Sequence, residues 1–169
     1  MQPEDGAPVF GAGIKFYADW GGDALYRTGL HLQHSVSKNG RQTIDIELAR
    51  IVQAGQSPDW KNKISLQLTG SELVDVTAAL LGVRKSAFGA YHGAGKNKGF
   101  QVHSNPAKGA LFAVSAKGEQ LRHLVGQADR AAAAAFFLSR LAGIWGLDAA
   151  TALRILERIE SSPEPEQSA

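Results

Sequence analysis

Basic and aromatic residues alternate through one segment of the chain that has no carboxylate. Between Val76 and Gly118 there is no Asp or Glu, whereas the same segment has six lysines and arginines and two histidines. The net charge of the whole chain is only +2, so the positive charge is segregated rather than large. Cations that pair with phosphates, beside rings that stack on unpaired bases, are the chemistry of single-stranded nucleic-acid binding. The alternative interpretation is a solvated surface whose lysines only aid solubility.

No enzyme motif is complete in the sequence. A phosphate-binding P-loop would need glycine in place of Ala90 and Ser or Thr in place of Asn97. His31 and His34 would lie on opposite faces of a strand, no His-x-x-x-His pair occurs, and there is no cysteine, so we expect no metal site. A Gly-x-Ser-x-Gly elbow is also missing. We therefore expect a protein that is not an enzyme and has no cofactor.

Four strands and then a helix are predicted in the first half of the chain. A first strand is expected at 9–20, which is rich in aromatic and branched residues, and alternation of apolar and polar residues predicts further strands at 29–36, 41–52 and 60–68. Asn39-Gly40 predicts a hairpin turn between the second and the third of these four strands. Thr69 and Glu72 have the spacing of a capping box, and Gly82 is placed to end the helix that follows.

Three or four further strands and then helices are predicted in the second half. Short strands are expected at residues 86–92, 99–104 and 111–116, separated by turn residues. From about Leu121 we expect helix, and Asp148 can cap a last helix through about Glu160. Phe137, Leu141 and Trp145 are spread around the long helix, so an oligomer that covers its extra apolar side is predicted.

Composition and the ends of the chain indicate one soluble domain. A hydrophobic content of 44% with 20% charged residues is typical of a globular protein. No stretch reaches the ~20 apolar residues of a membrane span, and from the acidic N-terminus we expect no secretory signal. We expect a flexible segment at residues 1–8, a single domain at 9–160 and a disordered acidic tail at 161–169. The expected location is the cytoplasm, in the nucleoid or outside it, without a membrane partner.

An ordered set of short motifs carries a family resemblance. Asp59-Trp60-Lys61-Asn62-Lys63 leads into Leu68-Thr69-Gly70-Ser71-Glu72, and downstream come Phe88-Gly89-Ala90-Tyr91-His92 and a helix ending in Gly143-Ile144-Trp145-Gly146-Leu147-Asp148. This series resembles the Asp-Trp-x-x-Lys strand, the Leu-Ser/Thr-x-x-Glu helix start, the Phe-Phe-His stretch and the terminal Gly-Trp-Asp of the Whirly single-stranded DNA-binding family. Guide-RNA-annealing mitochondrial RNA-binding proteins share that family's fold.

The resemblance implies an α+β fold and a function. The expected fold is β4-α-β4-α, with two antiparallel four-stranded sheets and with helices packed at the centre of a homotetramer. The implied function is sequence-tolerant binding of single-stranded DNA, or of RNA, through basic and aromatic residues at the sheet edges. Two alternatives stay open, an RNA-annealing factor and a non-catalytic structural or adaptor oligomer.

Thirteen residues are the candidate nucleic-acid contacts. Phosphate contacts are expected from Lys15, Lys38, Arg41, Lys61, Lys63, Lys96 and Lys98. Base stacking is expected from Tyr17, Trp60, Tyr91 and Phe100, with His92 and His103 as polar neighbours. Trp60 and Phe100 have a second interpretation as core residues, because large rings dominate protein cores.

Overall fold

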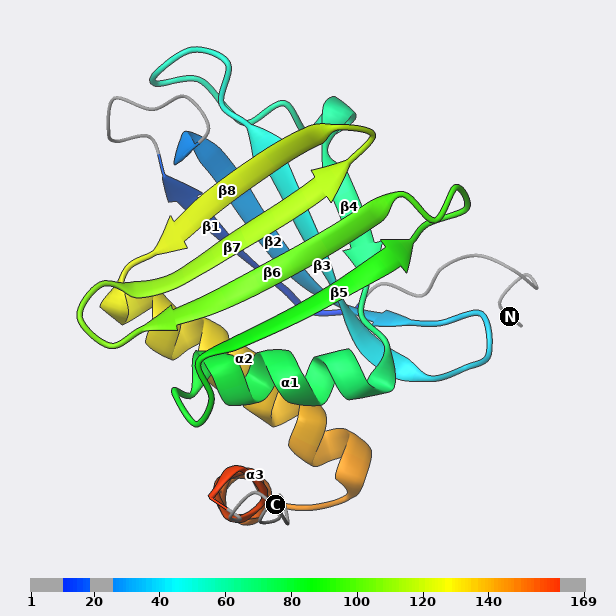
Figure 1. Ribbon diagram of the computed structural model, residues 1–169, viewed down its shortest axis with the longest axis vertical. Coiled ribbons are helices and arrows are strands. Elements are labelled where there is room, and N and C mark those ends of the chain that lie inside the picture. The colour runs from blue at the N-terminus through cyan, green and yellow to red at the C-terminus, as the bar shows by residue number, and fades with distance from the viewer. Residues whose placement is uncertain (1–10, 19–25, 162–169) are drawn as a thin grey trace, which may run out of the picture.

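Two four-stranded antiparallel sheets and three α-helices make an α+β fold, as expected from the sequence (Figure 1). The computed structural model describes residues 11–18 and 26–161. The N-terminal sheet contains, in spatial order, β1 (Gly13–Ala18), β2 (Thr28–Val36), β3 (Gln42–Arg50) and β4 (Ile64–Gln67). The C-terminal sheet contains β5 (Ser86–His92), β6 (Lys98–Asn105), β7 (Gly109–Ala116) and β8 (Glu119–Val125).

One face of each sheet contributes to a shared core. The pairing register sets one row across the N-terminal sheet, formed by Phe16, Leu30, Leu48 and Ile64. A row across the C-terminal sheet is formed by Phe100, Val114 and Leu121. All of these side chains are buried, and β8 lies against β1, β2 and β3. Because side chains alternate along a strand, the intervening residues form a second face on each sheet, called its outer face below.

Two of the three helices, α1 and α3, begin at residues whose side chains cap them. In α1 (Gly70–Leu80) the Thr69 hydroxyl accepts the Glu72 amide, and the Glu72 carboxylate accepts the Thr69 amide at 2.8 Å, which confirms the capping box. After α2 (Gln127–Trp145), the Asp148 side chain accepts the Thr151 amide at 2.7 Å and starts α3 (Ala149–Glu160). α1 packs on β5 and β6, and α2 packs on α1, so the helices lie together at one end of the sheets (Figure 1).

The expectation of helix from Leu121 is wrong, because residues 119–125 form β8. Leu121, His123 and Val125 are buried and alternate with more accessible residues, a period of two rather than of 3.6. Lys117 and Gly118 both have positive φ, 50° and 80°, as a tight two-residue hairpin turn requires. The last strand therefore pairs with β7 before the chain turns into α2.

Other boundaries differ from the prediction by a few residues. Residues 60–62, expected in a strand, form a short 3₁₀ helix, and β4 begins only at Ile64. The ends of the first expected strand, at 9–10 and 19–20, lie outside the described residues. The same is true of the segment 1–8 and of residues 162–169 of the expected tail.

The residues that suggested an oligomer are covered within the single chain. Phe137 and Leu141 are fully buried and Trp145 is partly buried, so these three side chains offer a partner little apolar surface, and the oligomer stays a prediction. Other apolar side chains of the two C-terminal helices and their connection are exposed, namely Ile144, Leu147, Ile155 and Ile159. Within residues 11–18 and 26–161, no single helix has both the length and the apolar character to cross a membrane; α2 and α3 taken together do, but they are bent by 95°.

Candidate nucleic-acid interface

The outer face of the C-terminal sheet has no carboxylate among the described residues. By register, its side chains are those of Ser86, Phe88 and Ala90 on β5, Gly99, Gln101 and His103 on β6, Leu111, Ala113 and Ser115 on β7, and Gln120, Arg122 and Leu124 on β8. Phe88 is 73% exposed although it lies within a strand. An exposed ring on a carboxylate-free surface can stack on a base without repelling the phosphates beside it.

Tyr91 is displayed by an irregularity at the edge of this sheet. The pairing of β5 with β6 shifts register between Gly89 and His92, as in a β-bulge. Within the irregular segment Tyr91 has a φ of 63°, a left-handed conformation that is unusual for a bulky residue. Its side chain is 80% exposed. Strained backbone of this kind persists where surrounding contacts enforce it and is common at functional sites.

The contacts that enforce the bulge come from the start of α1. Glu72 uses one carboxylate oxygen for the Thr69 amide and the other for the His92 ring, whose Nε2 lies 2.8 Å away. Gly89 leaves room for this arrangement, since a Cβ there would overlap the Glu72 carboxylate and lie 2.5 Å from the Phe100 ring. His92 is therefore an anchor of the bulge, largely covered, rather than the free polar neighbour that we expected.

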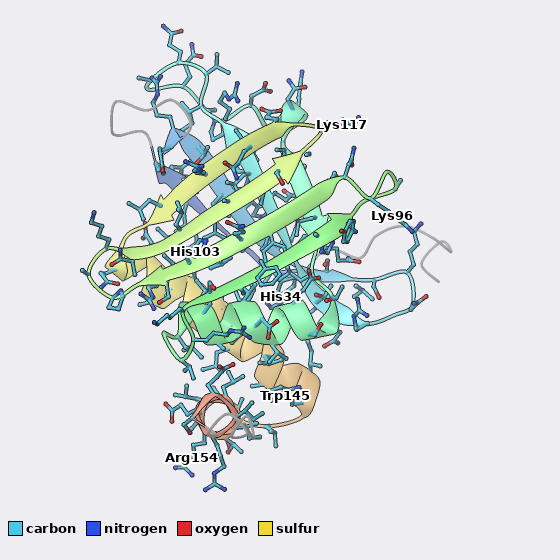
Figure 2. The ribbon with its side chains drawn as sticks, in the orientation of Figure 1. His34, Lys96, His103, Lys117, Trp145 and Arg154 are labelled. Atoms are coloured by element: carbon cyan, nitrogen blue, oxygen red, sulfur yellow. The ribbon has the colours of Figure 1, made fainter. Side chains whose placement is uncertain are left out.

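Two basic turns border the same end of the sheet. Lys96 lies in the β5–β6 turn with a φ of 51°, and Lys117 lies in the β7–β8 turn (Figure 2). Both side chains are exposed, and neither has an ion pair with a described residue. Lys98 differs from the prediction of a free loop cation, because its Nζ donates to the Ser65 carbonyl of β4 at 2.9 Å. Lys98 thus ties the C-terminal sheet to the N-terminal one.

Phe100 is not available for stacking. It is 3% exposed, because its register partner Val114 and its own place on β6 put it on the core face. The expectation of a base contact there is wrong, and the core interpretation holds. His103 is exposed on the outer face, with Nε2 3.3 Å from Oε1 of Gln101, and lies toward the other end of the sheet from Lys96 (Figure 2).

A second group of the expected residues lies on the N-terminal sheet. The Lys15 ammonium is 5.1 Å from the ring centre of Trp60, within the range of a cation–π contact. Trp60 is partly buried against Gly29, whereas Tyr17 is 57% exposed and lines a shallow hollow with Trp60. Lys61 is exposed on the adjoining 3₁₀ helix. These residues form a smaller aromatic and basic cluster, separate from Tyr91.

Buried carboxylates distinguish the outer face of the N-terminal sheet. Glu47 is 4% exposed and accepts hydrogen bonds from Lys63 at 2.8 Å and from His31 at 3.0 Å. Burial would raise the pKa of Glu47, but these two partners outweigh it and lower the pKa. Asp45, on the same face, has its pKa raised by burial, which the Ser35 hydrogen bond only partly offsets. Lys63 is therefore neutralised by Glu47 and is not the free phosphate contact that we expected.

The remaining expected cations lie apart from both clusters. Lys38 and Arg41 are exposed at the β2–β3 turn. The structure thus brings together Tyr91 and Lys96 at one end of the C-terminal sheet and places His103 toward its other end. It does not bring the thirteen residues into one site.

Phe88, Gln101 and Lys117 belong to the candidate interface but were missed as contacts. Lys117 had a usable signal, since it lies in the acid-free segment beside a turn glycine. Phe88 had a weaker signal. Residues 86–92 contain two aromatic residues, Phe88 and Tyr91, whose side chains would point to opposite faces of a regular strand, and no long apolar run shows which of the two faces the core. Gln101 follows only from its register with Phe88.

Comparison with protein-family models, with curated proteins and with solved structures found no match for this chain. In the part of the chain that the structure describes, no group of three or more His, Asp or Glu side chains gathers to hold a metal ion. The site is therefore defined by its own geometry, which is an open, basic and aromatic sheet surface.

Proposed function

We propose that the protein binds single-stranded nucleic acid, single-stranded DNA in the first place, on the outer face of the C-terminal sheet, without catalysing a reaction. The observation that carries the proposal is the pair of strongly exposed rings, Phe88 at 73% on a face that has no carboxylate among the described residues, and Tyr91 at 80% at the edge of the same sheet. Exposed rings supply stacking energy to any base, so binding is tolerant of sequence.

The sheet surface beside the two rings supports base stacking on them. A shallow hollow of about 190 Å³ lies on the sheet, lined in part by Gly89, Gly99, Ala113 and Ser115. Small side chains leave the surface flat beside the rings, so unpaired bases can lie against it. A duplex keeps its base faces stacked inside and exposes only its backbone and the edges of its bases, which do not stack on an exposed ring. Single strands should therefore bind more tightly than duplex.

The Whirly-like resemblance and the helices together support a homo-oligomer, with a tetramer as the proposed state. Exposed small residues repeat at helical spacing along α2, at Ala128, Ala132, Ala135, Ser139 and Gly143. Beside them Ile144, Leu147 and Ile155 are partly exposed apolar side chains. Such a surface allows close helix approach and leaves apolar area to bury against another copy. We place the protein in the cytoplasm, in keeping with its nucleic-acid partner.

The test compares binding of single-stranded DNA, single-stranded RNA and duplex DNA by the full chain at several salt concentrations. The proposal predicts tighter binding of the single strands, with a log–log salt slope of about −0.7 per phosphate neutralised. Tighter binding of RNA than of DNA would reassign the partner to RNA. Equal affinity for duplex, or no binding, would contradict the proposal and favour a structural adaptor.

A further inference from the structure

An open hollow lies where β5 begins, at the opposite end of that strand from the Lys96 turn. Its volume is about 580 Å³, and the α1–β5 connection and the end of β6 form its walls. The residues that matter for its chemistry are Lys85, Ser86 and His103, with Arg84 beside them. No carboxylate of the residues that the structure describes lines it.

The hollow offers hydrogen-bond donors and one free ammonium group, and beside it the Arg130 guanidinium donates to the Ser104 hydroxyl of the wall and has no ion pair with a described residue. The Lys85 side chain is exposed, and its ammonium has no ion pair or hydrogen bond with a described residue. The Ser86 hydroxyl also has no partner among the described residues, and the His103 ring is exposed beside it. Arg84 adds little net charge, because it pairs with Asp75 at 2.7 Å. Such a set suits one phosphate group rather than a polyphosphate.

The hollow is aligned with the two exposed rings. Ser86 pairs with His103 across the β5–β6 ladder, and Phe88 pairs with Gln101 two residues further along the same face. Tyr91 follows at the bulge near the end of β5. Six steps of about 3.3 Å separate the ends of this strand, so the row is about 20 Å long. Lys85 therefore lies at one end of the two rings, and Lys96 lies at the other.

We infer that the hollow is a phosphate subsite for the same single strand whose bases stack on Phe88 and Tyr91. The strand then runs along β5, from the hollow to the Lys96 turn. This inference rests on the proposed function. The occupant is a backbone phosphate of nucleic acid rather than a free phosphate ion, because one free cation on an open surface binds an isolated anion weakly. A tethered phosphate gains from the high local concentration that stacking of its neighbours provides.

The experiment measures the affinity of the full chain for a fluorescent oligothymidylate of about 16 nucleotides over a salt series. Lys85→Gln should weaken binding at low salt and reduce the magnitude of the salt slope by about 0.7, the value of one phosphate contact. Lys85→Arg should keep the slope of the unsubstituted protein. Arg154→Gln removes an equal charge from the exposed face of α3, away from the sheets (Figure 2), and should leave the slope unchanged. Melting temperatures show that each exposed substitution leaves the fold intact.

The outcomes distinguish failure of the phosphate subsite from failure of the proposed function. Equal slope changes for Lys85→Gln and Arg154→Gln would mean a diffuse field and would overturn the subsite. If the unsubstituted protein binds and Tyr91→Ala weakens binding, while Lys85→Gln changes nothing, the subsite fails and the proposed function stands. If the unsubstituted protein does not bind single strands, both fail.

Discussion

At the scale of single residues, side-chain exposure separates the rings that can meet a ligand from those that cannot. Phe88 and Phe100 lie on neighbouring strands, but Phe88 is 73% exposed and Phe100 is 3% exposed. The difference arises because alternate side chains of a strand point to opposite faces of the sheet, and Phe88 points to the outer face whereas Phe100 points to the core. The same reasoning applies to cations, because a lysine with a partner in the fold has less to offer a phosphate than a free one.

Lys96 and Lys98 provide a matched pair for this argument. Lys98→Ala removes the donor to the Ser65 carbonyl and should lower the free energy of unfolding by about 1 kcal/mol. Lys96→Ala removes an equal charge from an exposed turn and should change that free energy little. Urea denaturation measures both. Equal unfolding midpoints for the two variants would show that the Lys98 contact contributes nothing to the fold.

At the scale of elements, the start of α1 and the bulge of β5 form one unit. Glu72 closes the capping box and also holds the His92 ring at 2.8 Å, next to the residue with positive φ. Gly89 is required because its neighbours leave no space for a Cβ. The backbone next to Tyr91 is thus held by a contact from a different element.

A double-mutant cycle tests this dependence. His92→Ala should weaken binding of single-stranded DNA because the bulge loses its anchor. In a Tyr91→Ala background the same change should have little further effect, which corresponds to a coupling energy of about 0.5–3 kcal/mol. His103→Ala is the control for additivity: its ring contacts Gln101 and not Glu72, so any loss of binding that it causes should add to the loss from Tyr91→Ala. Additive effects of His92→Ala and Tyr91→Ala would show that His92 does not position the ring.

Local signals predicted much of the fold and little of the site. The alternation of β2 and β3, the capping box at Thr69 and the Asp148 cap all lie within short stretches, and the structure has them. The strand β8 was missed because its Lys117-Gly118 turn is an uncommon hairpin signal. The partners of Glu72, Lys98 and Lys63 depend on register and on packing between elements, which no local pattern contains.

At the scale of the whole molecule, the two outer faces differ in charge and the two sheets meet through a buried histidine. The outer face of the N-terminal sheet has Asp45 and Glu47, whereas that of the C-terminal sheet has no carboxylate among the described residues. Between the sheets, His123 is 1% exposed, with Nδ1 2.9 Å from the Thr28 hydroxyl. Thr28 in turn donates to the Arg122 carbonyl.

The lowered pKa of the buried His123 leads us to predict that the protein loses stability in mild acid. Burial lowers its pKa from 6.5 to about 4, against a smaller opposing effect of Thr28. Between these values the unfolded chain binds a proton that the folded chain does not, so the free energy of unfolding falls as pH falls. The loss reaches roughly 3 kcal/mol near pH 4, and His123 adds nothing further below it.

Urea denaturation across this range measures the effect, with His123→Gln as the comparison. The variant should be less stable at neutral pH but should show a shallower loss between about pH 6.5 and about pH 4. His34, whose pKa is also lowered by burial and by Arg140, should account for part of the loss that remains. An unchanged pH slope in the variant would show that His123 is not the group responsible.

The central claim is that a single strand binds to the exposed rings of the C-terminal sheet. The most direct measurement is the affinity of the Phe88→Ala, Tyr91→Ala double variant for single-stranded oligothymidylate, beside the unsubstituted protein and a duplex of the same length. We predict a loss of about 1–3 kcal/mol for each ring, with an unchanged salt slope and no change in the weaker duplex binding. Single-strand affinity equal to that of the unsubstituted protein would contradict the claim.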